Sequence, residues 1–237
     1  MGSWNRLIFT SFLLVILTEA ADPPTNQNDA CSQADIVFVL DSSGSIGVEH
    51  WGSVLSFFKF VVQQIPVGFY NTRFGSVTFG NEATINFQLN TYNTTQQILN
   101  AIDGIRYKDE NTNTSGALWM MRSIMFTSQN GDRRNAPNIA IVITDGRSTY
   151  DHNLTLPYAT DAKRAGITII AIGVGDQVDP AELNGIASVD TNGTPIVYQV
   201  DNYDALYTIE QEISSVACDI PVGELSRKIC CNFQDEF

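Results

Sequence analysis

The sequence has few basic residues. Its 237 residues include 13 Lys and Arg against 26 Asp and Glu, which gives a formal net charge of −13 at pH 7. Proteins that bind nucleic acid or anionic membranes use Lys and Arg to neutralise phosphate. The charge therefore argues against nucleic acid and membrane surfaces as partners, and it is compatible with cations or with basic protein surfaces.

Sequence motifs of catalysis are missing. The two histidines, His50 and His152, form no His-Glu-x-x-His pattern, and no glycine-rich loop ends in a phosphate-binding lysine. Ser43 lacks the Gly-x-Ser-x-Gly spacing of a nucleophile elbow. We therefore expect a binding protein and not an enzyme.

Beyond the N-terminus, no apolar run approaches the roughly 20 residues that a membrane-spanning helix needs. Residues 1–20 have a polar start with Arg6, an apolar core from Leu7 to Leu17, and small residues at their end, which is typical of a secretory signal peptide. A membrane anchor is the weaker alternative because this run is too short. We expect a protein secreted to the extracellular space or matrix, without membrane insertion.

Cysteine is also scarce, with four residues that allow three intramolecular pairings. Cys31 precedes the first predicted strand and Cys218 follows the last predicted helix, so a disulfide between them would join the two ends of the domain. Cys230 and Cys231 are adjacent, and a ring between neighbours is strained. A disulfide-linked oligomer through either of them and a free tail are equal alternatives.

Three short, branched apolar runs, residues 36–40, 139–143 and 167–172, predict parallel strands that are buried on both faces. Apolar residues at helical spacing separate or follow these runs: Trp51, Val54, Leu55 and Phe58; Leu118, Met121 and Met125; and Leu206, Ile209, Ile213 and Val216. The sequence thus predicts one domain over residues 34–217, after a leader at 21–33 and before a cysteine-containing tail at 218–237.

Local signals add helix starts and a hairpin. Asp179-Pro180 with Glu182 predicts a cap, a first helical residue and a capping partner, and Thr94 with Gln97 predicts a capping box. Residues 74–79 and the alternating residues 83–89, joined by a short link, predict a hairpin. We expect an α/β fold: a doubly wound, mostly parallel central sheet with one antiparallel edge strand and helices on both faces.

Three segments rich in oxygen ligands follow strands or precede a helix. They are Asp41-Ser42-Ser43-Gly44-Ser45, Asn111-Thr112-Asn113-Thr114-Ser115-Gly116 and Thr144-Asp145-Gly146. Ligands of doubly wound sheets bind beyond the carboxyl ends of the strands, where these segments would meet. Carboxylates and hydroxyls with little side-chain bulk form a sparse ligand set that suits Mg²⁺.

These three segments in this order, with Ile170-Ala171-Ile172-Gly173-Val174-Gly175, resemble the von Willebrand factor type A domain and its metal-ion-dependent adhesion site. The resemblance covers about residues 34–217 and implies a Rossmann-like fold. It also implies that Ser43 and Ser45 bind the metal directly, that Asp41 and Asp145 act directly or through water, and that Thr112 is a state-dependent ligand. The implied cation is Mg²⁺, with Ca²⁺ or Mn²⁺ as alternatives.

The resemblance further implies an extracellular protein ligand, such as collagen or another matrix protein. Uncharged hydroxyls leave the cation under-neutralised, so a carboxylate of the partner could complete its coordination. Two alternatives stay open. The protein could be a structural matrix cross-linker in which the metal stabilises the fold and tail cysteines join chains. Asp41 or Asp145 could also be an ordinary cap or turn residue.

The second loop departs from the family pattern, because Lys108-Asp109-Glu110-Asn111 stands where small glycines are common. The extra carboxylates could raise cation affinity and favour Ca²⁺, occupy the site, repel an acidic partner, or point to solvent. Four sequons begin at Asn93, Asn113, Asn153 and Asn192. A sugar on Asn113 would crowd the metal face, so we predict that Asn113 is unmodified and that some of the others carry glycans.

Overall fold

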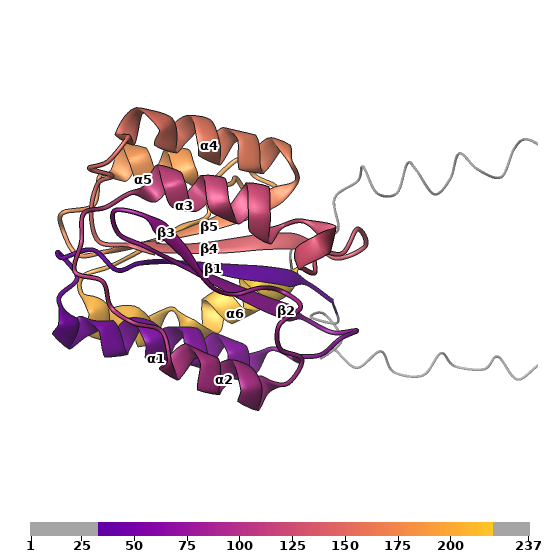
Figure 1. Ribbon diagram of the computed structural model, residues 1–237. Helices are drawn as coiled ribbons and strands as arrows, with labels where there is room; N and C mark the ends of the chain where they lie inside the picture. Colours follow the sequence, from indigo (N-terminus) through magenta and orange to yellow (C-terminus); the bar gives the residue numbers. More distant parts are fainter. Residues whose placement is uncertain (1–32, 220–237) are drawn as a thin grey trace, which may run out of the picture.

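The structure is a computed structural model that describes residues 33–219 (Figure 1). The predicted signal peptide, Cys31, Cys230 and Cys231 lie outside the described residues, as does the side chain of Cys218. The proposed Cys31–Cys218 disulfide and the alternatives for the tail therefore stay predictions.

A single six-stranded sheet forms the centre of the molecule, with the strand order β3-β2-β1-β4-β5-β6. All neighbouring strands are parallel except β2 and β3, which form the predicted antiparallel hairpin at one edge. The predicted doubly wound fold is confirmed. The strands are β1 (Asp35–Asp41), β2 (Arg73–Phe79), β3 (Ala83–Phe87), β4 (Asn138–Thr144), β5 (Ile167–Val174) and β6 (Val197–Val200).

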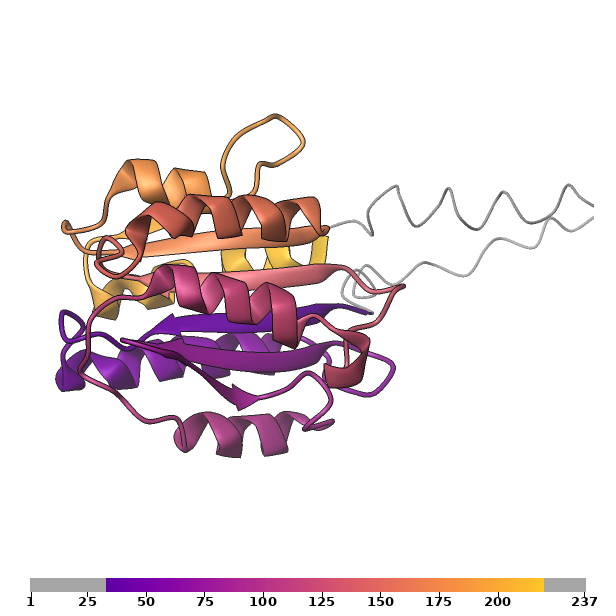
Figure 2. The same cartoon turned by 45° about the horizontal axis from the view of Figure 1, so that its top comes forward.

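Helices cover both faces of the sheet, as Figures 1 and 2 show. One face packs against α1 (Val48–Gln64), α2 (Thr95–Asp103), the 3₁₀ helix η4 (Tyr203–Thr208) and α6 (Glu210–Asp219). The other packs against α3 (Thr114–Met120), the π-helix η2 (Met121–Met125), α4 (His152–Arg164) and α5 (Pro180–Ile186). The 3₁₀ turn η3 (Ser128–Asn130) precedes β4. None of the described helices combines the length and apolarity needed to cross a bilayer.

The central strand β1 shows why residues 36–40 are all apolar. Ile36, Phe38 and Leu40 point into the core under α1, whereas Val37 and Val39 point into the core under α3 and α4. Successive side chains of a strand alternate between the two faces, so burial on both faces requires an uninterrupted apolar run. The strand can therefore present polar side chains only at its two ends, Asp35 and Asp41.

Both predicted helix caps, Asp179 and Thr94, are confirmed, but the side chains of their capping partners bond elsewhere. The Asp179 carboxylate accepts from Ala181 N and Glu182 N, as a cap does, but the Glu182 carboxylate accepts from Ser148 N at 2.9 Å. Glu182 was predicted to return to its own cap; instead it holds the loop after β4, which packs against the start of α5. In the Thr94 box, Gln97 N donates to Thr94 Oγ1 as predicted, and the Gln97 side chain accepts from Asn93 N.

Two predicted helical stretches are each divided. The stretch containing Leu118, Met121 and Met125 begins as α3 and continues as the π-helix η2. The stretch from Leu206 to Val216 begins as the 3₁₀ helix η4, whose Asn202 side chain accepts from Ala205 N, and continues as α6. Apolar spacing does not distinguish these helix types, because each places its apolar residues against the same face of the sheet.

Candidate metal centre

The carboxyl ends of β1 and β4 bring two of the three oxygen-rich segments together. The two strands are parallel neighbours, with Leu40 paired to Ile143, so Asp41 and the segment from Thr144 emerge side by side. The remaining segment, 111–116, is held beside the first by the two residues that precede it: Gly44 N donates to Glu110 O at 2.8 Å, and Asp109 N donates to Ser42 O at 3.1 Å. All three loops therefore meet at one edge of the sheet, on the left in Figure 1.

Hydrogen bonds connect four of the five predicted ligands. Ser45 Oγ donates to Asp145 Oδ1 at 2.8 Å, and it lies 3.1 Å from Ser43 Oγ. Ser43 N in turn donates to Asp41 Oδ1 at 2.9 Å. This cluster of Asp41, Ser43, Ser45 and Asp145 joins residues that are about 100 positions apart in the chain, and only the pairing of β1 with β4 brings them together.

The Asp41 side chain is the most deeply buried carboxylate of the cluster, with 1% of its residue surface exposed. Burial raises the pKa of Asp41 to about 6, although hydrogen bonds from Ser43 and Thr144 act in the opposite direction. Thr144 Oγ1 donates to Asp41 Oδ2 at 2.7 Å. A carboxylate that burial penalises in this way is a group whose ionised form a nearby cation would stabilise.

Thr112, the fifth predicted ligand, is placed differently. Thr112 is buried. Its backbone N–H donates to Thr149 Oγ1 at 3.1 Å, and its carbonyl accepts from the backbone N–H groups of Thr149 and Tyr150. Within residues 33–219, no hydrogen bond connects its side chain to the other four ligands. Thr112 is thus held beside the cluster through its backbone, and its hydroxyl is not part of it.

Tyr107 supports the first loop in a way that the sequence did not reveal. Its hydroxyl donates to Ser43 O at 2.8 Å and accepts from Gly47 N at 3.1 Å, so it bridges both ends of the loop that carries the two serines. A tyrosine that precedes a polar loop has no distinctive sequence signal. Only the approach of the second loop to the first assigns it this position.

The two additional carboxylates of the second loop do not hydrogen bond to the cluster. Glu110 Oε2 accepts from Asn81 N at 2.8 Å, which directs it to the turn between β2 and β3. Asp109, with φ of 56°, is exposed, and its Oδ1 lies 3.0 Å from where a β-carbon on Gly44 would stand. The bond to Asn81 therefore favours the alternative in which the Glu110 carboxylate points away from the cluster, over those in which it binds the cation or occupies the site.

Asn113, the sequon residue of the same loop, is committed to the fold. Its Oδ1 accepts from Gly116 N at 2.8 Å and from Ser115 Oγ at 3.0 Å, which caps α3, and its Nδ2 donates to Asn81 O at 2.8 Å. Only 9% of the residue is exposed. A sugar on Nδ2 would disrupt this arrangement, which agrees with the prediction that Asn113 is unmodified.

The residues present suit a hard divalent cation. Their donors are two hydroxyls and two carboxylates, and no group of three or more His, Cys, Asp or Glu side chains gathers anywhere in the described part of the chain. Such a set offers oxygen ligands to Mg²⁺ or Ca²⁺ while adding only two negative charges. The alternative of a simple turn residue explains the bond from Ser43 N to Asp41, but it does not explain why Ser45 reaches Asp145.

The open sheet and the oxygen cluster at its carboxyl edge together define an α/β domain with a candidate cation-binding face. The family model of the von Willebrand factor type A domain matches residues 35–212, and the chain belongs to this family.

Several relatives carry matrix or adhesion names. The chain is 34% identical to the Collagen alpha-6(VI) chain and 33% identical to Integrin alpha-X, both of Mus musculus, and 32% identical to Matrilin-1 of Gallus gallus. Each alignment covers 80% of this chain, and 8%, 16% and 38% of the respective relative. The chain thus spans well under half the length of these relatives.

Solved structures of proximal thread matrix protein 1 from the mussel byssus are similar in fold, with a TM-score of 0.73 and 26% identity over 79% of this chain and 48% of theirs. In one of these structures the metal-ion-dependent adhesion site (MIDAS) motif is occupied by zinc.

Proposed function

We propose that the protein is a secreted adhesion or matrix protein that binds an extracellular protein ligand, such as collagen, through a divalent cation at Asp41, Ser43, Ser45 and Asp145. Thr112 is a further ligand in this proposal. The bound cation supplies a positive centre that accepts a carboxylate of the partner. The observation that carries the proposal is the linked cluster of two hydroxyls and two carboxylates, since this set leaves a divalent cation incompletely neutralised by the protein.

The residues around the cluster support a protein ligand. Val48, the first residue of α1, is 73% exposed, and Tyr150, on the loop after β4, is 51% exposed. Exposed apolar and aromatic side chains near a polar centre are suited to the desolvated contacts of a protein interface. A cation that only stabilised the fold would not require them.

The non-catalytic and extracellular parts of the proposal have separate support. No histidine takes part in the hydrogen bonds of the cluster, so its serines lack the imidazole base of a Ser–His pair. The named relatives are collagen, matrilin and integrin chains, which favours a place outside the cell.

The test compares the wild-type protein with Asp41→Ala for binding to a panel of matrix proteins that includes collagens, in Mg²⁺, in Ca²⁺ and in chelator. We expect binding to require a cation and to be lost in Asp41→Ala. Asp103→Ala, which changes an exposed carboxylate on α2, is the matched control and should bind normally. Binding that survives chelator and is indifferent to Asp41 contradicts the proposal.

A second candidate function, a structural cross-linker of the matrix, is favoured by the similarity to a byssal thread matrix protein. In this case the cation stabilises the fold, and Cys230 or Cys231 joins chains. Chelation then lowers the melting temperature and leaves partner binding intact. Electrophoresis without reductant separates the two candidates further. If the tail joins chains, the wild type should run as a linked oligomer, and the double variant Cys230→Ser, Cys231→Ser should run as a single chain.

A further inference from the structure

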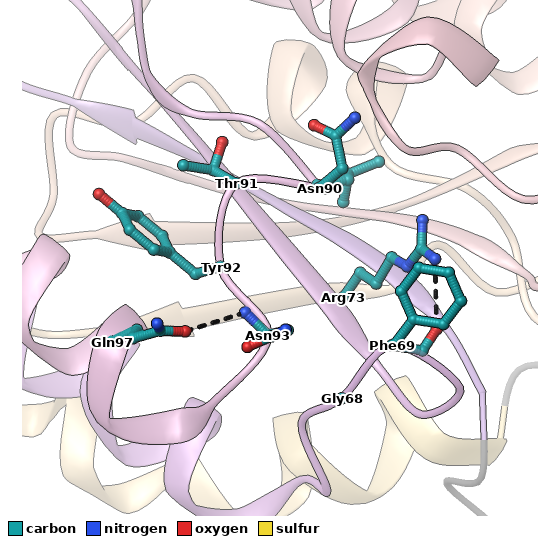
Figure 3. Close-up of a pocket in the computed structure, with 9 residues that line it drawn as sticks. Gly68, Phe69, Arg73, Asn90, Thr91, Tyr92, Asn93 and Gln97 are labelled. Atoms are coloured by element: carbon teal, nitrogen blue, oxygen red, sulfur yellow. Dashed lines mark hydrogen bonds between the residues drawn. The ribbon is translucent and has the colours of Figure 1, made fainter.

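A pocket opens at the end of the sheet opposite to the cluster of Asp41, Ser43, Ser45 and Asp145. It has a volume of about 180 Å³ and lies between the loop before β2, the segment after β3 and the first turn of α2 (Figure 3). Because β2 has seven residues at about 3.3 Å each, the pocket is roughly 20 Å from the cluster. Its lining consists of Gly68, Phe69, Arg73, Leu89, Asn90, Thr91, Tyr92, Asn93 and Gln97.

The lining combines aromatic rings, uncharged polar groups and one cation, Arg73. Phe69 is 61% exposed, and the Arg73 guanidinium carbon lies 4.7 Å from the centre of its ring. Arg73 also donates to Phe69 O at 3.2 Å and to Gly131 O at 2.8 Å, so the aromatic side chain stands on a braced loop. Tyr92 packs against Phe87 in an edge-to-face arrangement at 5.5 Å. Phe69 also packs edge-to-face against Tyr70, with ring centroids 4.9 Å apart, and its remaining exposed surface is open to a further packing partner.

Asn93 brings a candidate partner to this pocket. It begins the sequon Asn93-Thr94-Thr95, it is exposed, and Figure 3 shows it between Gln97 and Arg73. Its backbone N–H donates to Gln97 Oε1 at 3.2 Å, whereas none of the hydrogen bonds of the described residues uses its side-chain amide. Asn113 is the opposite case, because its amide is buried and bonded on both sides.

We propose that Asn93 carries an N-linked glycan whose first N-acetylglucosamine lies in this pocket against Phe69 and Tyr92. The glycan comes from a polyprenyl-diphosphate-linked oligosaccharide. The bond between sugar C1 and the diphosphate oxygen breaks, the bond between C1 and Asn93 Nδ2 forms, Nδ2 loses one proton, and the polyprenyl diphosphate leaves. The proposal requires the secretory route of the proposed function, but it does not depend on cation or partner binding.

The chemistry of the pocket fits this sugar. One face of the sugar ring consists of C–H groups, which pack on aromatic rings, and its edges carry hydroxyls and an acetamido group. Asn90, Thr91 and Gln97 offer amide and hydroxyl groups around the pocket to these edges. Because the sugar is tethered at the lip of the pocket, its local concentration is high and little orientational freedom is lost when it packs.

The test uses the full chain with Asn153→Gln and Asn192→Gln, secreted from a glycosylating host, so that Asn93 is the main site under study. Glycopeptide mass spectrometry should find Asn93 modified. After an endoglycosidase has trimmed the glycan to one N-acetylglucosamine, Tm should exceed that of the same chain without sugar by about 2 to 4 °C, the effect of roughly one additional packed contact.

Phe69→Ala, made in both forms, should abolish this difference. The loss of the Arg73 contact is common to both forms and cancels in the comparison. Tyr207→Ala is the matched control: Tyr207 is 69% exposed, lies on η4 and does not line the pocket, so the difference should persist.

A direct measurement avoids the variants. Nuclear Overhauser contacts between the acetyl methyl or ring protons of the sugar and the rings of Phe69 or Tyr92 should appear in the trimmed glycoprotein. An unmodified Asn93, an absent rise in Tm, a rise that survives Phe69→Ala, or absent contacts to both rings each overturn the proposal.

Discussion

At the scale of single residues, Asp41 combines burial with a position at the end of the central strand. Its carboxylate accepts from Ser43 N and Thr144 Oγ1, and burial raises its pKa to about 6. Those two hydrogen bonds favour the ionised form without offsetting the cost of burial. In the absence of a cation, the charged carboxylate therefore destabilises the fold near neutral pH.

The pH dependence of stability tests this cost. The folded-state pKa of Asp41 lies above the unfolded value of about 3.9, so the folded state binds more protons between them and loses stability as pH rises. In chelator, urea unfolding should show that Asp41 costs the wild type about 2 kcal/mol more at pH 7.5 than at pH 4. Asp41→Asn should lack this component, and equal pH slopes for the two proteins would contradict the assignment.

Tyr107 gives a second residue-scale prediction. Tyr107→Phe removes the bonds to Ser43 O and Gly47 N while keeping the ring, so the loop with Ser43 and Ser45 loses its support. Groups that orient metal ligands from outside typically affect metal affinity by about 10-fold or more. Calorimetric titration with Mg²⁺ should show about a 10-fold weaker Kd. Tyr70→Phe, at the far end of the domain, is the control, and an unchanged Kd in Tyr107→Phe would refute the role.

At the scale of elements, the start of β1 is held by a buried ion pair. Asp35 is fully buried; its Oδ1 accepts from Arg133 Nε at 2.9 Å and its Oδ2 accepts from Arg133 N at 2.7 Å. Arg133 also donates to Ala34 O. The pair joins the first strand to the segment that precedes β4, and it holds the end of the sheet opposite to the cluster.

Removing one partner of this pair should be costly, because it leaves the other charge buried and unpaired. Asp35→Asn should lower the free energy of unfolding by about 3 to 5 kcal/mol in urea titrations. The exposed pair between Lys59 on α1 and Asp103 on α2 provides the control, since Asp103→Asn should cost less than about 1 kcal/mol. Similar losses for both variants would show that burial does not determine the contribution of Asp35.

At the scale of the whole molecule, the sheet separates the two proposed functional sites. The candidate cation site lies at the carboxyl ends of β1 and β4, and the pocket beside Asn93 lies at the start of β2. Sites that far apart, with no shared side chains, should contribute to stability independently. Changes at one end are therefore controls for the other.

Cation binding provides the corresponding prediction. At a Mg²⁺ concentration of 100 times Kd, the folded state gains about 2.7 kcal/mol, or a rise of roughly 5 to 10 °C in Tm. Scanning calorimetry should show this rise in wild type and in Phe69→Ala, but not in Asp145→Asn, which removes a carboxylate that accepts from Ser45. A rise that persists in Asp145→Asn would place the cation elsewhere.

The sequence was sufficient to predict the architecture and most of the cluster, because these features follow from short stretches of neighbouring residues. Residues 36–40 are apolar at every position, which predicts a strand buried on both faces, and Asp41, Ser43 and Ser45 directly follow it. The order of strands and helices then brings Asp145 to the same edge. The π-helix after α3, the division of the last helix and the short strand β6 were not predicted, since their local patterns do not differ from those of ordinary helices and loops.

By itself, the sequence thus determined the fold class, the edge of the sheet where ligands gather, and the donor types at that edge. Only the tertiary structure decided how those donors are used: Tyr107 supports the serine loop, Thr112 is held through its backbone, and Glu110 turns to the β2–β3 link. It also decided that Asn113 is buried and that Asn93 lies beside a pocket. The reason is that strand and helix patterns depend on neighbours in the chain, whereas these contacts join residues that the sequence separates and the sheet brings together.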